Sequence, residues 1–561
     1  MYITHAVQDE KLGFYRVMIR EFYEGRTVLL TGGTGFYGQG LLAKMMRCLP
    51  GIAKIYVPIR AAKNRDGTEV SVDQRLHTLL NEAAVFDRFR KEDPEGFAAS
   101  AQKVVAVECD MLKPVLGFRE PVYAQLQDEL DILVSCAATV SFDDPLDHSL
   151  QLNTLGPKEI LELARACKKN PILVHVSTAY VSGRQAGSIA EDLLPVDRDI
   201  KQIVEGDYVG EPFDVEREIA EGLSRCTEIR ARAESVEQES IFRREILEQS
   251  RSASFSEARL TKLIEGHRRR WIESELVREG MKRAQARGWN DVYTYTKGMG
   301  EQLLVKKRGK VSLVIVRPAI TESSLSDPEP GWIHGLKVTD PLVVAYGRGI
   351  VPDFPARRGA AMDLVPIDIV INAIVLAPVR ADAETVRVFH AATSGQNPLF
   401  NTEMFEYVKS YFSAHPLLAK DGSRPELVDW TFPSVGSFRR ALRWRYMYPI
   451  EVQQWLLDKL PQGHKTNRRK RRLGAIKARL KRVQYFVDLF SPYTTLDCRF
   501  QMVKMLELYE SLPPEEQRIF NVDVRQIDWE QYYQHTHLPG LRRHLLKREG
   551  AVDPVLADVD D

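Results

Sequence analysis

Short apolar runs alternate with helix-length amphipathic segments over the first 180 residues of the chain. The runs lack strict alternation of apolar and polar positions, which predicts strands that are covered on both faces. Helical segments between them, such as 39–49 and 156–169, complete the pattern of a doubly wound parallel sheet, an α/β fold. The five apolar runs are TVLLT (27–31), IYVPI (55–59), KVVAVE (103–108), DILVS (131–135) and ILVHVS (172–177).

The pattern changes in two later parts of the chain. Residues 196–290 are dense in Glu and Arg and have few strand signals, so we expect an insertion of charged, solvated helices. Strands resume at 311–318 and 386–393. The remaining chain has helical periodicity and is rich in aromatic and basic residues. We therefore expect an α/β domain over 1–415 and a mainly helical C-terminal domain over 416–561.

Composition excludes several classes of protein. The 561 residues are 44% hydrophobic, which is enough for more than one domain, and the net charge of +1 gives no reason to expect a nucleic-acid partner. The N-terminus lacks a signal-peptide pattern. The sequence also contains no run of about 18 apolar residues, so we expect no membrane span. The six cysteines are scattered, which favours reduced thiols in the cytoplasm, and no metal-ligand cluster is visible. The residues carry no signal for an oligomeric state.

A glycine-rich turn, TGGTGFYG, follows the first predicted strand. Gly32, Gly35 and Gly38 have the spacing of a nucleotide-binding turn that opens a helix. Glycine there allows a tight turn and a close approach of the backbone to a pyrophosphate. This turn makes the predicted sheet Rossmann-like and implies a dinucleotide cofactor. The residues that we expect to contact it are Thr31, Gly32, Gly33, Thr34, Gly35, Phe36 and Gly38.

The end of the second strand distinguishes the two nicotinamide cofactors. NAD-selective proteins typically have an acidic residue there for the ribose hydroxyls. Here Arg60, Lys63 and Arg65 follow the strand, and these cations suit a 2′-phosphate, which predicts NADPH; a plain basic surface loop is the alternative. Further cofactor contacts are expected after the third and fourth strands, from Asp110, Met111 and Ala137.

Two tyrosines and a lysine lie close together in NDVYTYTKGMGEQLL (290–304). Residues four apart share a helix face and residues two apart do not, so Lys297 lies beside Tyr293 and not beside Tyr295. We therefore expect Tyr293 to be the proton donor, with its pKa lowered by the Lys297 ammonium, and Tyr295 to be a packing residue. Lys297 also suits a contact with the nicotinamide ribose.

A hydroxyl group is expected at the end of the fifth strand. The segment ILVHVSTAYVSG offers Ser177 and Thr178, either of which could hydrogen-bond a substrate carbonyl oxygen as negative charge develops on it. The residues alone leave both candidates open.

Together these motifs closely resemble the extended short-chain dehydrogenase/reductase superfamily. Within it the chain is similar to the fatty acyl-CoA reductases, and the order of motifs is most similar to the bacterial, wax-ester-type members. The similarity covers nearly the whole chain, including a C-terminal segment that resembles the domain particular to the alcohol-forming enzymes. The segments are FYEGRTVLLTGGTGFYGQGLL, VSCAATVSFDDPLDHSLQLNTLG, VHVSTAYVSG, YTYTKGMGEQLL, VRPAITESS, PGWIHG and FNVDVRQIDWEQYYQHTHLPGLRRHLLK (520–547).

The resemblance assigns roles to residues. It implies that Thr178, Tyr293 and Lys297 form the catalytic set, and it favours Thr178 over Ser177. It also implies that Asn153 supports the lysine through water, although a helix cap is the alternative, and that Pro318 brings backbone toward the nicotinamide amide. Pro157 and Gly298 differ from the usual family residues.

The activity that the resemblance implies is the reduction of a long-chain fatty acyl-CoA by NADPH, through an aldehyde, to the fatty alcohol. One alternative is an aldehyde-forming thioester reductase that acts on acyl-CoA or on an acyl carrier protein. A nucleotide-sugar epimerase is disfavoured by the basic loop at Arg60 and by the C-terminal similarity. A non-catalytic nucleotide sensor is disfavoured by the intact pair Tyr293 and Lys297.

A strongly basic segment lies at 464–490. It has ten Lys or Arg residues before position 484 and no carboxylate from 459 to 487. Apolar residues at helical spacing predict an amphipathic helix with a cationic face, which suits peripheral contact with an anionic membrane. The alternatives are capture of CoA phosphates or of an acidic carrier protein, or an apolar stripe that simply packs on the domain core. The apolar positions are Leu473, Ile476, Leu480, Val483, Val487 and Phe490.

Overall fold

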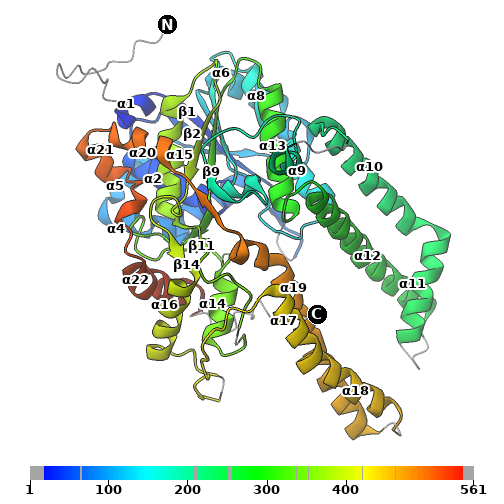
Figure 1. Ribbon diagram of the computed structural model, residues 1–561. Coiled ribbons are helices and arrows are strands. Elements are labelled where there is room, and N and C mark those ends of the chain that lie inside the picture. The colour runs from blue at the N-terminus through cyan, green and yellow to red at the C-terminus, as the bar shows by residue number, and fades with distance from the viewer. Residues whose placement is uncertain are drawn as a thin grey trace.

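The computed structural model describes residues 18–546, except 64–65, 207–210, 250–254, 337, 352, 420 and 461–462, so that Arg65 and the acidic tail lie outside it. Its centre is a seven-stranded parallel sheet in the order β13-β9-β7-β6-β1-β2-β5 (Figure 1). The strand order reverses between β1 and β6, which is the switch point of a doubly wound sheet. The strands are β1 (Thr27–Leu30), β2 (Lys54–Ile59), β5 (Val104–Glu108), β6 (Ile132–Ser135), β7 (Ile172–Val176), β9 (Ser312–Pro318) and β13 (Arg387–Ala391).

Helices cover both faces of this sheet. Along β1, Val28 and Leu30 pack into the core on one face, whereas Leu29 packs into the core on the other. Side chains alternate along a strand, so burial of both sets explains the apolar runs without alternation. All seven predicted runs are strands, and the predicted fold class is confirmed. Helices α2 (Phe36–Cys48), α3 (Val72–Glu82) and α15 (Ile367–Leu376) lie on the Val28 face, and α6 (Glu120–Glu129), α8 (Gly156–Ala166) and α13 (Val292–Lys307) on the Leu29 face.

The charged insertion forms a helical arm that extends from the body beside α13 (Figure 1). At its base, Glu218 and Ile219 pack toward α13, and at its outer part Phe242 and Leu260 form a small separate core. The rest of the surface carries ion pairs, such as Arg268 with Glu239 at 2.8 Å. The predicted solvated helices are therefore present: α9 (Ile200–Glu205), α10 (Val215–Glu234), α11 (Val236–Gln249) and α12 (Glu257–Ala286).

A smaller lobe adjoins the carboxyl end of β9. Strand β10 (Ile320–Glu322) pairs with β12 (Leu364–Pro366), and β11 (Ala361–Met362) pairs with β14 (Leu399–Phe400). Helices α14 (Asp340–Gly347) and α16 (Asn401–Ala414) complete this lobe.

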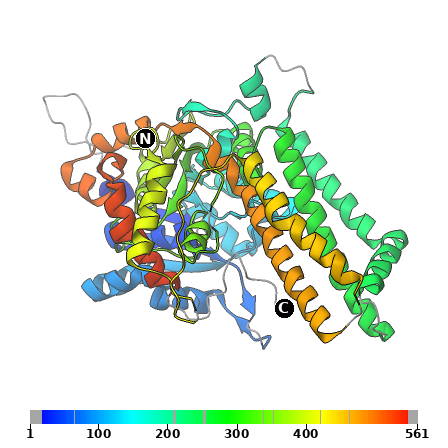
Figure 2. The ribbon, with the colours of Figure 1, turned by 60° about the horizontal axis from the view of Figure 1, so that its bottom comes forward.

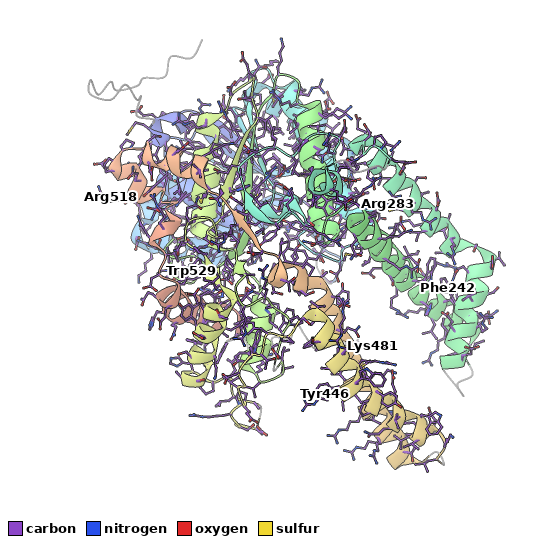
Figure 3. All side chains as sticks on the ribbon, in the orientation of Figure 1. Phe242, Arg283, Tyr446, Lys481, Arg518 and Trp529 are labelled. Atoms are coloured by element: carbon purple, nitrogen blue, oxygen red, sulfur yellow. The ribbon has the colours of Figure 1, made fainter. Side chains whose placement is uncertain are left out.

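A helical hairpin then projects away from the sheet (Figures 1 and 2). One side consists of α17 (Val435–Ala441), the π-helical turn η6 (Leu442–Met447) and α18 (Tyr448–Asp458), and the other side is the long α19 (His464–Thr495). Its side chains include Tyr446 and Lys481, labelled in Figure 3.

The basic segment 464–490 is helical, as expected, but its apolar stripe is not available to a membrane. Leu473 is buried and forms a small core with Ile450 and Leu457 of α18, with Ile476 and Leu480 packed against it. Farther along, Val487 is fully buried. The expectation that this stripe faces a bilayer is therefore wrong, because α18 and the smaller lobe cover it. Within the described residues, none of the helices is both long enough and apolar enough to cross a membrane.

After α19 the chain returns to the sheet. Strand β15 (Cys498–Phe500) pairs in parallel with β8 (Gly187–Ile189). Phe500, Phe520 and Trp529 join the same core as Val28, so this part of the C-terminal region shares the core of the sheet. The remaining helical elements are α20 (Val503–Glu510), α21 (Pro514–Ile519), α22 (Trp529–Gln531), the π-helical turn η8 (Tyr532–His537) and α23 (Leu538–Leu541).

Candidate active site

The glycine turn has no room for side chains. Gly32 has a φ of +72°, and a Cβ atom there would lie 2.9 Å from the backbone nitrogen of Ala137. A Cβ on Gly38 would lie 2.0 Å from the carbonyl oxygen of Gly32. Gly35 caps helix α2, and its N–H donates to the Gly32 carbonyl at 2.8 Å. Because the backbone lies bare at a helix N-terminus, these residues fit the pyrophosphate of a dinucleotide.

Neighbouring residues fix the position of this turn. The hydroxyl oxygen of Thr31 accepts hydrogen bonds from the N–H groups of Cys136 and Ala137, at 3.0 and 3.2 Å. The Thr34 carbonyl accepts one from the side chain of Gln39 at 2.9 Å. The Phe36 ring packs on Trp332, with centroids 5.3 Å apart. The predicted cofactor residues of β1 and β6 thus lie together at the switch point. A Cβ on Gly33, the other glycine of the turn, would lie 2.5 Å from Cγ1 of Val57.

Two of the basic residues after β2, Arg60 and Lys63, are exposed. The carbonyl of Arg60 accepts a hydrogen bond from Arg75, and no side-chain partner of Arg60 is found within the described chain. Lys63 lies in a small hairpin of β3 (Ala62–Lys63) and β4 (Glu69–Val70), 3.5 Å from the Glu69 carboxylate, with both side chains mostly exposed. Such a pair is weak in solvent, so Lys63 can exchange Glu69 for another anion.

Two further residues that were predicted to contact the cofactor, Asp110 and Met111, follow β5. Asp110 accepts a hydrogen bond from the N–H of Leu112 at 3.1 Å and pairs with Lys113 at 3.7 Å. Met111 packs close to Gly156, the first residue of α8, where a Cβ would lie 2.9 Å from its methyl carbon.

Helix α13 carries the tyrosine and the lysine on one face. Asp291 caps the helix by accepting a hydrogen bond from the N–H of Thr294 at 2.8 Å. Lys297 is buried, and its ammonium donates to the carbonyl of Val176, the last residue of β7, at 2.7 Å. Tyr293 is half-buried, one turn earlier.

Thr178, and not Ser177, contacts Tyr293. The Thr178 hydroxyl donates to the Pro318 carbonyl at 3.4 Å, accepts from the N–H of Tyr180 at 3.3 Å and hydrogen-bonds Tyr293. The Ser177 hydroxyl is buried and makes no hydrogen bond to any described residue. The ends of β7 and β9 and helix α13 thus bring together Thr178, Tyr293, Lys297 and Pro318.

The expected lowering of the tyrosine pKa by the lysine is wrong for the protein without cofactor. Burial raises the pKa of Tyr293, and the hydrogen bond between Tyr293 and Thr178 offsets this only in part. Burial also lowers the pKa of Lys297, to about 8. Desolvation disfavours the charged form of each group, and the ammonium points at the Val176 carbonyl instead of the phenol.

Tyr295 is a packing residue, as predicted, and it also holds the insertion in place. It is buried, and its hydroxyl donates to Glu218 of α10 at 2.6 Å. Glu218 is also paired with Arg283 at 3.0 Å and with Arg287 at 2.7 Å. Tyr295 therefore ties the catalytic helix to the arm.

Asn153 lies inside the π-helical turn η3 (Gln151–Leu155) and is not a helix cap. Its side-chain oxygen accepts a hydrogen bond from the N–H of Thr139 at 3.0 Å, and its amide donates to the Thr296 hydroxyl at 3.1 Å. The residue thus links the loop after β6 to the helix that carries Lys297.

An apolar pocket lies close to Tyr293. The ring of Phe142 is 5.9 Å from that of Tyr293 and stacks on that of Tyr493 at 5.0 Å, between centroids. Tyr493 lines the pocket, which measures about 720 Å³ including its open mouth. Its wall comes from α14, α16 and α19, through residues such as Leu342, Ala345, Met404, Val483, Phe486 and Phe490. Sequence analysis did not find this pocket, because its walls come from separate parts of the chain.

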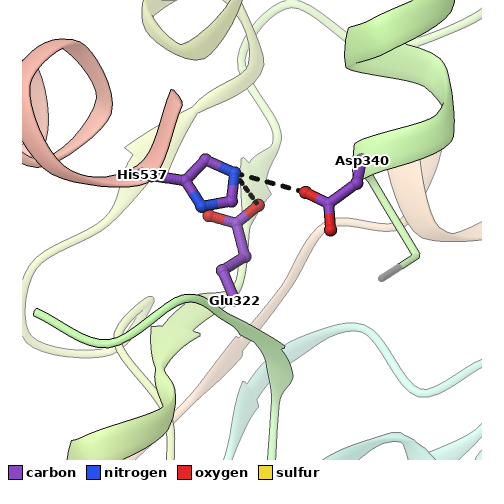
Figure 4. A group of neighbouring side chains, drawn as sticks. All are labelled: Glu322, Asp340 and His537. Atoms are coloured by element: carbon purple, nitrogen blue, oxygen red, sulfur yellow. Dashed lines mark ion pairs between the residues drawn. The ribbon is translucent and has the colours of Figure 1, made fainter. Parts of the chain in front are cut away.

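Three buried titratable groups meet behind this pocket (Figure 4). The Nε2 atom of His537 lies 3.3 Å from Asp340 and 3.8 Å from Glu322. Burial opposes a charge on His537, but Glu322 and Asp340 outweigh it and raise the pKa of the ring. The group could also hold a metal ion, which the sequence did not indicate. As an ion-paired cluster it joins η8 to β10 and α14.

Comparisons with known proteins agree with this architecture. Residues 30–374 match the NAD-binding part of the male sterility protein family, and residues 466–548 match its C-terminal part. In structure, the chain is similar to the terminal reductase domain of the myxalamid biosynthetic pathway, with a TM-score of 0.50 and 18% identity over 93% of this chain and 91% of that one. Fold and glycine turn together define a nicotinamide-dependent oxidoreductase with a Rossmann-like reductase fold.

Full-length relatives identify the family. The chain is 30% identical to fatty acyl-CoA reductase 1 of Arabidopsis thaliana, over 94% of this chain and 99% of the relative. It is 28% identical to the alcohol-forming fatty acyl-CoA reductase of Simmondsia chinensis, over the same shares. The chain belongs to the fatty acyl-CoA reductase family.

Proposed function

We propose that this protein reduces long-chain fatty acyl-CoA with NADPH, through an aldehyde, to the primary alcohol. One observation carries this proposal: the Thr178, Tyr293 and Lys297 side chains lie beside an apolar pocket whose wall includes residues of three helices. The name of the Simmondsia relative, an alcohol-forming enzyme, supports the same product. A bacterial, wax-ester type, the narrower resemblance in the sequence, remains a prediction.

NADPH, when bound, supplies hydride to the carbonyl carbon of the substrate. The glycine turn, Thr31 and Ala137 hold the dinucleotide, and Arg60 and Lys63 bind its 2′-phosphate. Asp110 and Met111 would flank the adenine, Pro318 would lie on the side of the nicotinamide amide, and Lys297 would bind the ribose.

Thr178 and Tyr293 act on the substrate oxygen. As the thioester is reduced, negative charge grows on this oxygen, and the Thr178 hydroxyl stabilises it by a hydrogen bond. Tyr293 remains neutral because its pKa is raised by burial, and it donates its proton only once a strongly basic alkoxide forms beside it. The hemithioacetal then returns its hydroxyl proton to Tyr293 as its C–S bond breaks, so that an aldehyde forms and CoA leaves as the thiolate, which takes a proton from solvent. In a second round, with fresh NADPH bound, Thr178 and Tyr293 would act in the same way on the aldehyde oxygen to give the alcohol.

The acyl chain occupies the apolar pocket between α14, α16 and α19. Burial of methylene groups stabilises binding by roughly 0.8 kcal/mol each, which favours long chains. The ring pair of Phe142 and Tyr493 separates this pocket from Tyr293, so a chain that passes these rings presents its carbonyl to the phenol.

The direct test is incubation of the purified protein with palmitoyl-CoA and either NADPH or NADH, followed by gas chromatography of the products. Hexadecanol with NADPH supports the proposal. No reduction of palmitoyl-CoA with either cofactor would exclude it. The alternative, an aldehyde-forming reductase of acyl-CoA or acyl carrier protein, is tested by one equivalent of NADPH together with an aldehyde trap.

We further propose that the chain works as two functional parts, a reductase part over 1–415 and a C-terminal part over 416–561 that completes the acyl pocket. A cytoplasmic location, peripheral to a membrane, suits the apolar substrate, and the six free cysteines favour a reducing compartment.

A further inference from the structure

A row of large apolar side chains lies exposed along one face of η6 and α18 and continues to Leu460, just after α18 ends. Their positions follow a helical spacing of three or four residues, so that they share one face. We call this set the α18 stripe; it consists of Trp444, Tyr448, Val452, Trp455, Leu456 and Leu460, with exposed fractions of 66, 49, 37, 56, 50 and 51%.

The fold does not need these residues. The opposite face of α18 packs on α19 through Ile450 and Leu457, which are both buried. Trp444 packs only against Tyr448, with centroids 5.5 Å apart, among the aromatic contacts of the described residues. The α18 stripe is therefore an apolar surface that remains uncovered after the hairpin has formed its own core.

The surroundings of the α18 stripe are strongly basic. From 435 to 495 the sequence contains fifteen Lys or Arg residues and three carboxylates. Each carboxylate already has a basic partner: Glu451 with Lys477, Asp458 with Lys470 and Asp488 with Arg439. The exposed cations of the hairpin include Arg443, Arg445, Lys459, Arg468, Arg469, Arg471 and Arg472. An anionic partner is thus favoured along the whole hairpin.

We propose that the hairpin docks on an anionic lipid bilayer, with the α18 stripe inserted at the level of the head groups. Tryptophan and tyrosine prefer this interface, and Leu456 and Leu460 supply acyl-chain contacts. Lys459 lies 3.7 Å from the centroid of the Trp455 ring, an arrangement that brings a cation and an aromatic ring to the same depth. The hairpin projects from the body, away from the sheet (Figures 1 and 2).

Docking there also brings the membrane close to the acyl pocket. The same helix that supports the α18 stripe, α19, contributes Val483, Phe486 and Phe490 to the wall of the pocket. This consequence rests on the proposed function, because it takes the pocket as the acyl site. The docking itself does not, and it can be measured without substrate.

The test is co-sedimentation of the full-length protein with phosphatidylcholine vesicles that contain about 30 mol% phosphatidylserine, compared with phosphatidylcholine alone. We expect binding to the anionic vesicles that weakens with salt, and a blue shift of tryptophan fluorescence. The variant Trp444→Ser/Trp455→Ser should lose about tenfold in binding, since two interfacial anchors are gone. The variant Arg471→Glu/Arg472→Glu should lose the preference for anionic lipid.

The matched control is Leu418→Ser, which removes an apolar side chain of similar exposure, 59%, in the loop after α16. It should bind as the wild type does. Reduction of octanoyl-CoA, a water-soluble substrate, should be unchanged in Trp444→Ser/Trp455→Ser, which separates docking from catalysis. Wild-type protein that ignores anionic vesicles at low salt would overturn the proposal. A second outcome would also overturn it: the wild type does not bind vesicles, and light scattering shows that it is a dimer which Trp444→Ser/Trp455→Ser converts into monomers.

Discussion

Tyr493, near the end of helix α19, donates a hydrogen bond to Asp291, the residue that caps helix α13. The two residues are 202 positions apart in the chain. Asp291 is buried, and burial raises its pKa to about 6. The C-terminal region thus touches the helix of Tyr293 and Lys297 directly, through a carboxylate that titrates just below neutral pH.

The first prediction concerns the stability of this link. Because the folded pKa of Asp291 lies above its ordinary value of 3.8, the protonated form favours folding, and this contribution is lost as the pH rises through about 6. Above pH 6 the buried Asp291 carboxylate is charged, and the groups that donate hydrogen bonds to it, such as Tyr493, then contribute more to stability. Tyr493→Phe should therefore lower the free energy of unfolding by about 1–2 kcal/mol at pH 7.5 and by less at pH 5.

Thermal unfolding at the two pH values measures this difference. In an Asp291→Asn background, which keeps a good helix cap, Tyr493→Phe should have the same effect at both pH values. A loss in the Tyr493→Phe single variant that is equal at pH 5 and pH 7.5 would contradict the assignment of the titration to Asp291.

The second prediction separates the two tyrosines of α13. Tyr293→Phe should abolish reduction while cofactor binding, followed by fluorescence, is retained, because only the proton donor is removed. Tyr295→Phe should keep most activity and cost about 1 kcal/mol of stability, since Glu218 still has Arg283 and Arg287. If both variants lose activity equally, Tyr293 is not the specific acid.

The third prediction is a pH limit set by Lys297. Burial lowers the pKa of Lys297 to about 8, so the ammonium is lost as the pH rises through that value. Since kcat/KM reports the free enzyme, it should fall on the alkaline side with an apparent pKa near 8. The Lys297→Arg variant should have a lower kcat/KM. Because arginine keeps its positive charge, the apparent pKa of the alkaline limb should rise.

The exposed Lys310, which follows the same helix, provides the control: Lys310→Gln should leave the profile unchanged. An alkaline limb that stays near 8 in Lys297→Arg would assign the titration to another group.

The fourth prediction tests the choice of cofactor. Arg60→Ala should raise the KM for NADPH about tenfold with little change for NADH, because a charge-assisted contact with the 2′-phosphate is lost. Lys63→Ala should have a smaller effect, since Lys63 is shared with Glu69. Steady-state kinetics with both cofactors measure this. If the wild-type enzyme uses NADH and NADPH with equal kcat/KM, the prediction has no basis.

Sequence alone predicted the features that depend on local rules. Burial on both faces of the sheet requires continuous apolar runs in the strands, as Val28 and Leu29 illustrate. The four-residue spacing placed Tyr293 and Lys297 on one helix face. The cap at Asp291 was also open to sequence analysis, since an aspartate precedes the helix and bonds three residues ahead.

Features that depend on contacts between distant segments were out of reach. The apolar period of α19 was interpreted as a surface for an anionic membrane, with packing on the domain core as the alternative, and nothing in the sequence indicated that α18 covers it. The raised pKa of Tyr293 results from burial, which no local pattern encodes, and the meeting of Glu322, Asp340 and His537 needs the whole fold.

The fifth prediction concerns the length of the acyl chain. Val483 is half-buried on α19 and lines the apolar pocket, whereas the neighbouring Gln484 is also half-buried but does not line it. Val483→Trp fills part of the pocket without touching Thr178, Tyr293 or Lys297. It should therefore raise the KM for palmitoyl-CoA by about tenfold and leave that for octanoyl-CoA nearly unchanged, because only the long chain reaches the blocked part.

Gln484→Trp adds the same ring one position away. It should leave the ratio of the KM values for the two substrates as in the wild type. Circular dichroism and thermal unfolding show whether both variants keep the wild-type fold. If Val483→Trp raises the KM for both substrates equally, the change reflects general damage near Tyr493. If it changes neither, the acyl chain lies elsewhere, and the pocket between α14, α16 and α19 has no part in binding the substrate.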